Sequence, residues 1–140
     1  ENDRGEILHH RTAPWTDPWK ESLDLPGASQ VASIGDLIRK FSWWDLRPAH
    51  EELLVVQPGE DAPERFVSLL RDQTFSVILI YFPRAEKIRI YNPGDRSYRV
   101  ERFDPVGGSF VASSETLEGR ILDLSWSGPE DQVLILRRSN

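Results

Sequence analysis

The 140-residue chain is acidic: 23 aspartates and glutamates face 17 lysines and arginines, and the formal net charge is −6. This balance argues against nucleic acid as a main partner, and the absence of cysteine excludes disulfides, thiolate metal sites and a cysteine nucleophile. No apolar run reaches the roughly 18 residues needed to cross a bilayer, so no membrane partner is expected.

Residues 1–25 are predicted to form an irregular arm. Trp15 and Trp19 alternate with Pro14 and Pro18, a pattern that suits neither a helix interior nor a central strand. The chain also begins at Glu1 and contains no methionine, which suggests a fragment of a longer protein.

The three histidines give little reason to expect a metal or a catalytic triad. His9 and His10 are neighbours, and no histidine or carboxylate follows them at a metal-binding spacing. We expect a solvated loop there, although with Arg11 the pair could border a substrate cleft if a catalytic barrel were present. His50 lacks a serine or cysteine nucleophile in a recognisable context. No catalytic residue, metal or cofactor is therefore predicted.

An amphipathic helix is predicted between residues 26 and 41. Its apolar stripe consists of Val31, Ile34, Leu37, Ile38 and Phe41, spaced at i, i+3, i+6, i+7 and i+10. A helix of this length is marginal alone and needs a surface to cover the stripe, supplied by the following β domain or by a missing domain. In the connector after it, Trp43 and Trp44 are expected to fill the interface between helix and β domain.

The rest of the chain predicts an antiparallel β-sandwich of seven or eight strands. Short runs rich in Ile, Val, Phe and Tyr recur between turn signals. The expected strands are 53–56, 66–70, 76–82, 88–91, 98–103 and 133–136.

Aromatic and basic residues of the β region are candidates for ligand binding. Tyr91 and Tyr98 flank the turn Asn92–Asp95, and they either contact a ligand or form a cross-strand pair that closes a hairpin. Lys87, Arg89 and Arg96 are either a basic strip for an acidic glycan or simply a solvated strand face. The predicted ligand-binding candidates are Trp15, Trp19, Tyr91, Tyr98 and Arg89.

Five motifs occur in an order that resembles a known family. They are Leu25–Gln30 (LPGASQ), Phe41–Pro48 (FSWWDLRP), Ile80–Pro83 (IYFP), Arg102–Gly108 (RFDPVGG) and Pro129–Leu136 (PEDQVLIL). Together they are similar to the C-terminal region of apiosidase-like glycoside hydrolases, where a TIM barrel is followed by a β-sandwich domain named for collagen binding. Two departures concern aromatic positions: Arg102 and Phe103 stand where the family usually has Trp-Tyr, and Gln132 stands where it tends to have Trp.

The resemblance implies a division of the chain at residue 48. Residues 1–48 would be the end of a glycosidase barrel, and residues 49–140 an accessory β-sandwich. The family's catalytic carboxylates lie on earlier barrel strands, so this chain alone is not expected to be an enzyme. A secreted or periplasmic location would follow if the chain is like the family.

Three functions remain open at this stage. The first is a non-catalytic accessory module that supports a catalytic barrel, which would be its partner. The second is a carbohydrate- or collagen-binding module, with a polysaccharide or fibrous protein as partner. The third is an independent hydrolase that uses acidic residues of the sandwich, for which no pair of carboxylates stands out.

Overall fold

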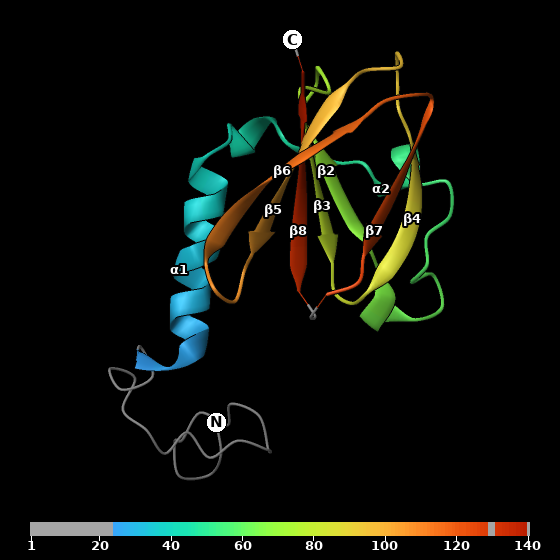
Figure 1. Ribbon diagram of the computed structural model, residues 1–140. Coiled ribbons are helices and arrows are strands. Elements are labelled where there is room, and N and C mark those ends of the chain that lie inside the picture. The colour runs from blue at the N-terminus through green and yellow to red at the C-terminus, as the bar shows by residue number, and fades with distance from the viewer. Residues whose placement is uncertain (1–23, 129–130, 140) are drawn as a thin grey trace, which may run out of the picture.

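The computed structural model of the protein describes residues 24–128 and 131–139 (Figure 1). It is mainly β, with eight strands in two antiparallel sheets and one main helix, which confirms the predicted fold class. The larger sheet has the order β1-β2-β3-β8-β5-β6, formed by Arg47–Pro48, Ser68–Arg71, Val77–Phe82, Gln132–Arg138, Tyr98–Asp104 and Ser109–Leu117. The smaller sheet pairs β4 (Glu86–Tyr91) with β7 (Ile121–Trp126).

The two sheets pack face to face around the main core. Ile78 and Ile80 of the central strand β3 point from the six-stranded sheet into this core, and Ile88, Ile90 and Leu122 point into it from the two-stranded sheet. Because successive side chains of a strand point to opposite faces, the same alternation sends the other residues of β4 and β7 to the solvent.

The main helix α1 (Pro26–Arg39) packs against the outer face of the six-stranded sheet and leaves part of that face exposed (Figure 1). Leu37 is buried there against Leu79, Val133 and Ile135, with Phe41 at the edge of the cluster. The predicted helix is therefore confirmed, and the six-stranded sheet buries apolar residues on both faces. This explains why all five residues from Gln132 to Leu136 are buried.

The predicted strand over residues 53–56 is wrong. The short helix α2 (His50–Leu53) occupies its start, and only Leu54 forms an isolated bridge, with Ile90 of β4. Leu53 and Leu54 are both buried, so this apolar run reflects packing into the core and not a strand. Two 3₁₀ turns, η2 (Trp43–Asp45) and η3 (Pro63–Arg65), complete the connections. In the described part of the chain, no helix has the length and apolar character that a membrane span requires.

Candidate functional site

Two of the five predicted ligand-binding residues come together on one surface. Arg89 and Tyr91 lie two residues apart on β4, and both side chains point to the solvent from the outer side of the two-stranded sheet. Tyr91 is 50% exposed. Trp15 and Trp19, as well as His9 and His10, lie outside the described residues.

We call this surface the β4–β7 face. Its side chains alternate with the core residues of the two strands: Lys87, Arg89, Tyr91, Ile121, Asp123 and Ser125. The strand register places Arg89 opposite Asp123 and Tyr91 opposite Ile121. A row of polar groups with one aromatic ring therefore stands on a sheet whose other side is buried.

Two open hollows follow each other along the β4–β7 face. The first, about 530 Å³, is floored by Lys87, Arg89 and Asp123 and bounded by Val55, Val56 and Pro58. The second, about 630 Å³, lies between Tyr91, Ile121 and Arg120 and the turn Asn92–Asp95. Both hollows are shallow and solvent-accessible, which suits an extended ligand rather than a small enclosed one.

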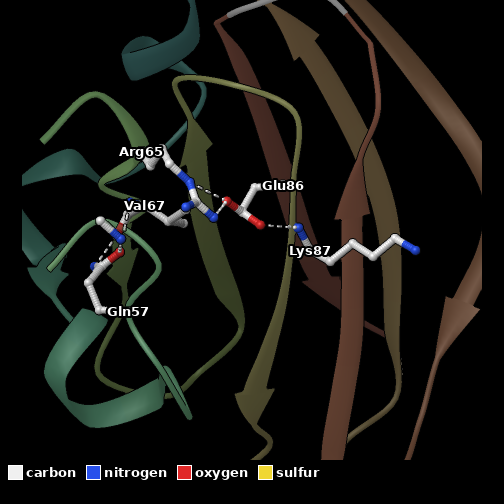
Figure 2. Close-up of polar contacts among 6 residues, drawn as sticks. Gln57, Arg65, Val67, Glu86 and Lys87 are labelled. Atoms are coloured by element: carbon white, nitrogen blue, oxygen red, sulfur yellow. Dashed lines mark hydrogen bonds and ion pairs between the residues drawn. The ribbon is translucent and has the colours of Figure 1, made fainter. Parts of the chain in front are cut away.

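The margin of the first hollow is fixed by polar contacts (Figure 2). Arg65 Nε and Nη2 donate to Glu86 Oε2 at 2.9 and 2.5 Å, and the Lys87 backbone N–H donates to Glu86 Oε1 at 3.1 Å. The Arg65 hydrogen bonds lower the pKa of Glu86, partial burial opposes this, and the Lys87 N–H lowers the pKa further. Figure 2 shows the Lys87 side chain pointing away from Glu86, so its ammonium does not pair with the Glu86 carboxylate.

The turn beside the second hollow is held by Asn92, a buried polar residue that the sequence reading passed over. Its Nδ2 donates to the carbonyls of Arg96 and Gly119, both at 2.7 Å, and its Oδ1 accepts from the Arg96 N–H at 3.2 Å. Asn92 thereby ties the β4–β5 turn to the β6–β7 connection. Its only sequence signal was its place in an Asn-Pro-Gly-Asp turn.

Tyr98 does not belong to this surface, and its prediction as a surface ligand contact is corrected. It lies on β5 in the six-stranded sheet, is 0% exposed, and its hydroxyl donates to the Phe75 carbonyl at 2.9 Å. The cross-strand pair with Tyr91 is also wrong, because Tyr98 pairs with Leu117 and Arg138 while Tyr91 pairs with Ile121. The turn Asn92–Asp95 leads from one sheet to the other.

Arg96 likewise lies apart from Lys87 and Arg89. Its guanidinium carbon is 5.2 Å from the centre of the Phe75 ring, on which Arg71 also stacks at 4.6 Å. The basic strip of three residues is therefore reduced to Lys87 and Arg89, which Arg120 extends on the far side of Tyr91.

A second surface is apolar and lies between α1 and the six-stranded sheet. This α1 groove has a volume of about 360 Å³. It is lined from the helix side by Ile34, Leu37, Ile38, Phe41 and Trp43, and from the sheet side by Leu46, Ser68, Leu70, Leu79, Tyr81 and Val133. Large parts of Ile34, Ile38 and Leu70 stay exposed, at 44%, 39% and 37%.

The two tryptophans of the connector do not fill the interface as predicted. Trp43 and Trp44 are 58% and 60% exposed and contact each other edge to face, with ring centres 5.9 Å apart. The helix meets the sheet through Leu37 and Phe41 instead, and both indoles stay largely exposed to the solvent. Trp43 borders the α1 groove, so the aromatic connector enlarges the exposed apolar surface.

The described residues do not form a recognisable catalytic or metal centre. Among them, no group of three or more His, Asp or Glu side chains could hold a metal ion. His50 packs edge to face on Phe66. Burial raises the pKa of Asp72, but hydrogen bonds from the Thr74 hydroxyl and the Val77 N–H outweigh it and leave the pKa lowered. A glycosidase general acid requires a raised pKa, so neither Asp72 nor Glu86 suits that role.

Comparison with known proteins places the fold beside parts of glycoside hydrolases. No family model matches the chain, and no curated protein matches its sequence. A solved structure described as a glycoside hydrolase matches with a TM-score of 0.72 and 13% identity, over 88% of this chain and 28% of that one. A glycoside hydrolase family 5 structure from Bacteroides vulgatus matches with a TM-score of 0.71 and 14% identity, over 86% and 26%. The chain thus spans about a quarter of these hydrolases and shares the fold of that part.

Proposed function

We propose that this chain is a non-catalytic accessory region of a glycoside hydrolase and that its α1 groove packs against the catalytic domain. The observation that carries the proposal is the incompletely covered helix α1. Leu37 is buried against the sheet, whereas Val31, Ile34 and Ile38 of the same predicted apolar stripe are 70%, 44% and 39% exposed. The surface of a second protein domain would bury these three side chains, which the sheet leaves exposed.

The energetic argument favours a partner on this face. Full burial of a Val or Ile side chain stabilises by about 1.5–3 kcal/mol, and Ile34, Ile38 and Trp43 border one continuous apolar hollow. Contiguous apolar surface of this kind is typical of interaction sites. The partial coverage of the matched hydrolases supports a partner that is the remainder of such an enzyme.

In this proposal the chain divides near residue 48. Helix α1 and the segment before it would complete the catalytic barrel, as the resemblance to apiosidase-like hydrolases implies. Residues 49–140 would form the accessory sandwich, which holds the barrel's last helix against β3 and β8. Catalysis would reside in the barrel and not in this chain.

The test is to express the 140-residue chain together with the catalytic domain encoded in the same reading frame. We expect a stable complex that Ile34→Asp and Ile38→Asp disrupt, because each variant places a charge in the contact. Val111→Asp is the matched control, since Val111 is 58% exposed on the edge strand β6 and does not line the groove. A reading frame without a hydrolase domain, or hydrolysis of an aryl glycoside by this chain alone, would contradict the proposal.

A second candidate function is polysaccharide binding by the β4–β7 face. The observation that favours it is the half-exposed ring of Tyr91 beside Arg89 and Asp123 on a rigid sheet. Aromatic rings with a polar tip suit surfaces where one side of a ligand is apolar and the other is wet. Figure 1 shows β4 and β7 on the side of the molecule away from α1, so this face stays open when the α1 groove is covered.

A further inference from the structure

We propose that the β4–β7 face binds an acidic polysaccharide, with Arg89 and Lys87 receiving the carboxylates of uronic acid units and Tyr91 supporting a neighbouring sugar ring. This inference rests on the second candidate function and adds the chemical class of the ligand. It does not depend on the docking of the α1 groove.

The first argument is the free binding capacity of the charged groups. In the part of the chain that the structure describes, the side chains of Lys87, Arg89 and Asp123 make no hydrogen bond or ion pair, whereas Arg65 nearby is paired with Glu86. A guanidinium group binds a carboxylate through two parallel hydrogen bonds, and a lysine adds a point charge. Lys87 and Arg89 stand on one side of β4 with Cα atoms about 7 Å apart, the spacing of residues i and i+2 in a strand.

The second argument is the charge balance of the two hollows. Lys87, Arg89 and Arg120 line them together with Asp95 and Asp123, a local excess of cations on a chain whose net charge is −6. Because the chain as a whole is negatively charged, anions are attracted where cations locally outnumber carboxylates, and the β4–β7 face is such a place. Asp123, opposite Arg89, adds a carboxylate that can accept hydrogen bonds from sugar hydroxyls.

The third argument is shape. The hollows at Arg89 and at Tyr91 succeed each other along β4, so a ligand that contacts both must be extended. The walls are anchored by buried residues: Leu54 bridges to Ile90 of β4, and Asn92 holds the turn after β4. A rigid, shallow and partly polar trough fits a chain of sugar units better than a compact ligand.

The experiment is affinity electrophoresis of the 140-residue chain in gels containing polygalacturonate, alginate or hyaluronan, with methyl-esterified polygalacturonate as the neutral ligand. We expect retardation by at least one acidic polymer, with a Kd that rises about tenfold or more in Tyr91→Ala and in Arg89→Gln. Trp44→Ala and Arg99→Gln are matched controls, because both residues are exposed on other surfaces and should leave the Kd unchanged. Binding should weaken as salt is added.

The outcomes separate the inference from the function on which it rests. Retardation only by the esterified polymer, abolished by Tyr91→Ala, would overturn the acidic class while keeping polysaccharide binding. No retardation by any of the polymers would overturn both. Retardation that Trp44→Ala or Arg99→Gln weakens as much as Tyr91→Ala would place the site elsewhere and overturn the assignment to this face.

Discussion

The side-chain amide of Gln57 pairs with both backbone groups of Val67 as a neighbouring strand would. Gln57 Nε2 donates to the Val67 carbonyl at 2.9 Å, and Gln57 Oε1 accepts from the Val67 N–H at 3.0 Å (Figure 2). The same oxygen accepts from the Gly59 N–H at 3.3 Å. One side chain thus ties the loop after Leu54 to the residue before β2, and that loop forms the wall of the first hollow.

We expect Gln57→Ala to lower the free energy of unfolding by about 1–3 kcal/mol, because both backbone groups of the fully buried Val67 lose their partner. Urea denaturation monitored by tryptophan fluorescence measures the change. Gln73→Ala is the control, since Gln73 is exposed and its loss should change the free energy of unfolding by less than about 0.5 kcal/mol. Equal stability of the two variants would contradict the role given to Gln57.

Gly59 is required because the backbone of Phe66 passes too close for a side chain. A Cβ at residue 59 would lie 2.2 Å from Phe66 N and 2.3 Å from Phe66 Cα. We expect Gly59→Ala to cost about 1–3 kcal/mol of unfolding free energy, since a backbone segment must shift to make room. Gly27→Ala provides the comparison: no atom lies within 4 Å of its added Cβ, and alanine favours the helix. Thermal melts of both variants measure the difference, and a Tm for Gly59→Ala at or above that of the natural sequence would contradict this account.

The sequence predicts the helix and the central strands because burial there matches a simple period. The apolar stripe of α1 and the runs of β3 and β8 mark the elements that face a core. Strand β6 (Ser109–Leu117) was missed because it is an edge strand with no buried residue, so its sequence carries no apolar alternation. Strand β7 does alternate, with Leu122 and Leu124 buried, but its run also holds Ile121, which is 42% exposed and blurs the pattern.

The candidate site could be predicted only in part, because sequence spacing does not say which sheet a strand joins. Alternation on β4 correctly places Arg89 and Tyr91 on one exposed face. Tyr98, seven residues further on, looked equivalent, but the chain changes sheets at the turn after Tyr91 and buries it. Asp123 and Arg120 join the site through the long-range pairing of β4 with β7, which no local pattern encodes.

Alkaline pH should destabilise the protein through Tyr81. Partial burial, the hydrogen bond that its hydroxyl donates to Asp131 and the charge of that carboxylate raise the pKa of Tyr81 to about 12. The unfolded chain releases this proton near the ordinary pKa of about 10. The stabilisation is therefore fully present below pH ~10 and is lost as the pH rises to about 12.

Tyr81→Phe should remove this part of the pH dependence. We expect the difference in unfolding free energy between the natural protein and the variant to be constant up to pH ~10 and to shrink between pH ~10 and 12. Urea denaturation at a series of pH values measures it. Asp131→Asn keeps a hydrogen-bond acceptor but removes the charge, so it should shift the loss to lower pH. A pH-independent difference between the natural protein and Tyr81→Phe would show that Tyr81 titrates normally.

Tyr98→Phe should weaken the fold without affecting ligand binding. Its hydroxyl satisfies the carbonyl of Phe75, a bulky residue held in the left-handed region at φ 55°, which such residues rarely adopt. Removing the hydroxyl leaves that carbonyl without its partner, and we expect a loss of about 1–3 kcal/mol in unfolding free energy.

Tyr91→Ala should show the opposite behaviour to Tyr98→Phe. The Tyr91 ring is half exposed, so the free energy of unfolding should change by less than about 1 kcal/mol, while the Kd for the acidic polymer rises about tenfold or more. Measuring the free energy of unfolding and gel retardation of both variants, at a temperature where both are folded, separates the core tyrosine from the surface tyrosine. If Tyr98→Phe lost retardation while fully folded, the ligand would have to contact the six-stranded sheet, and the β4–β7 face would not be the binding surface.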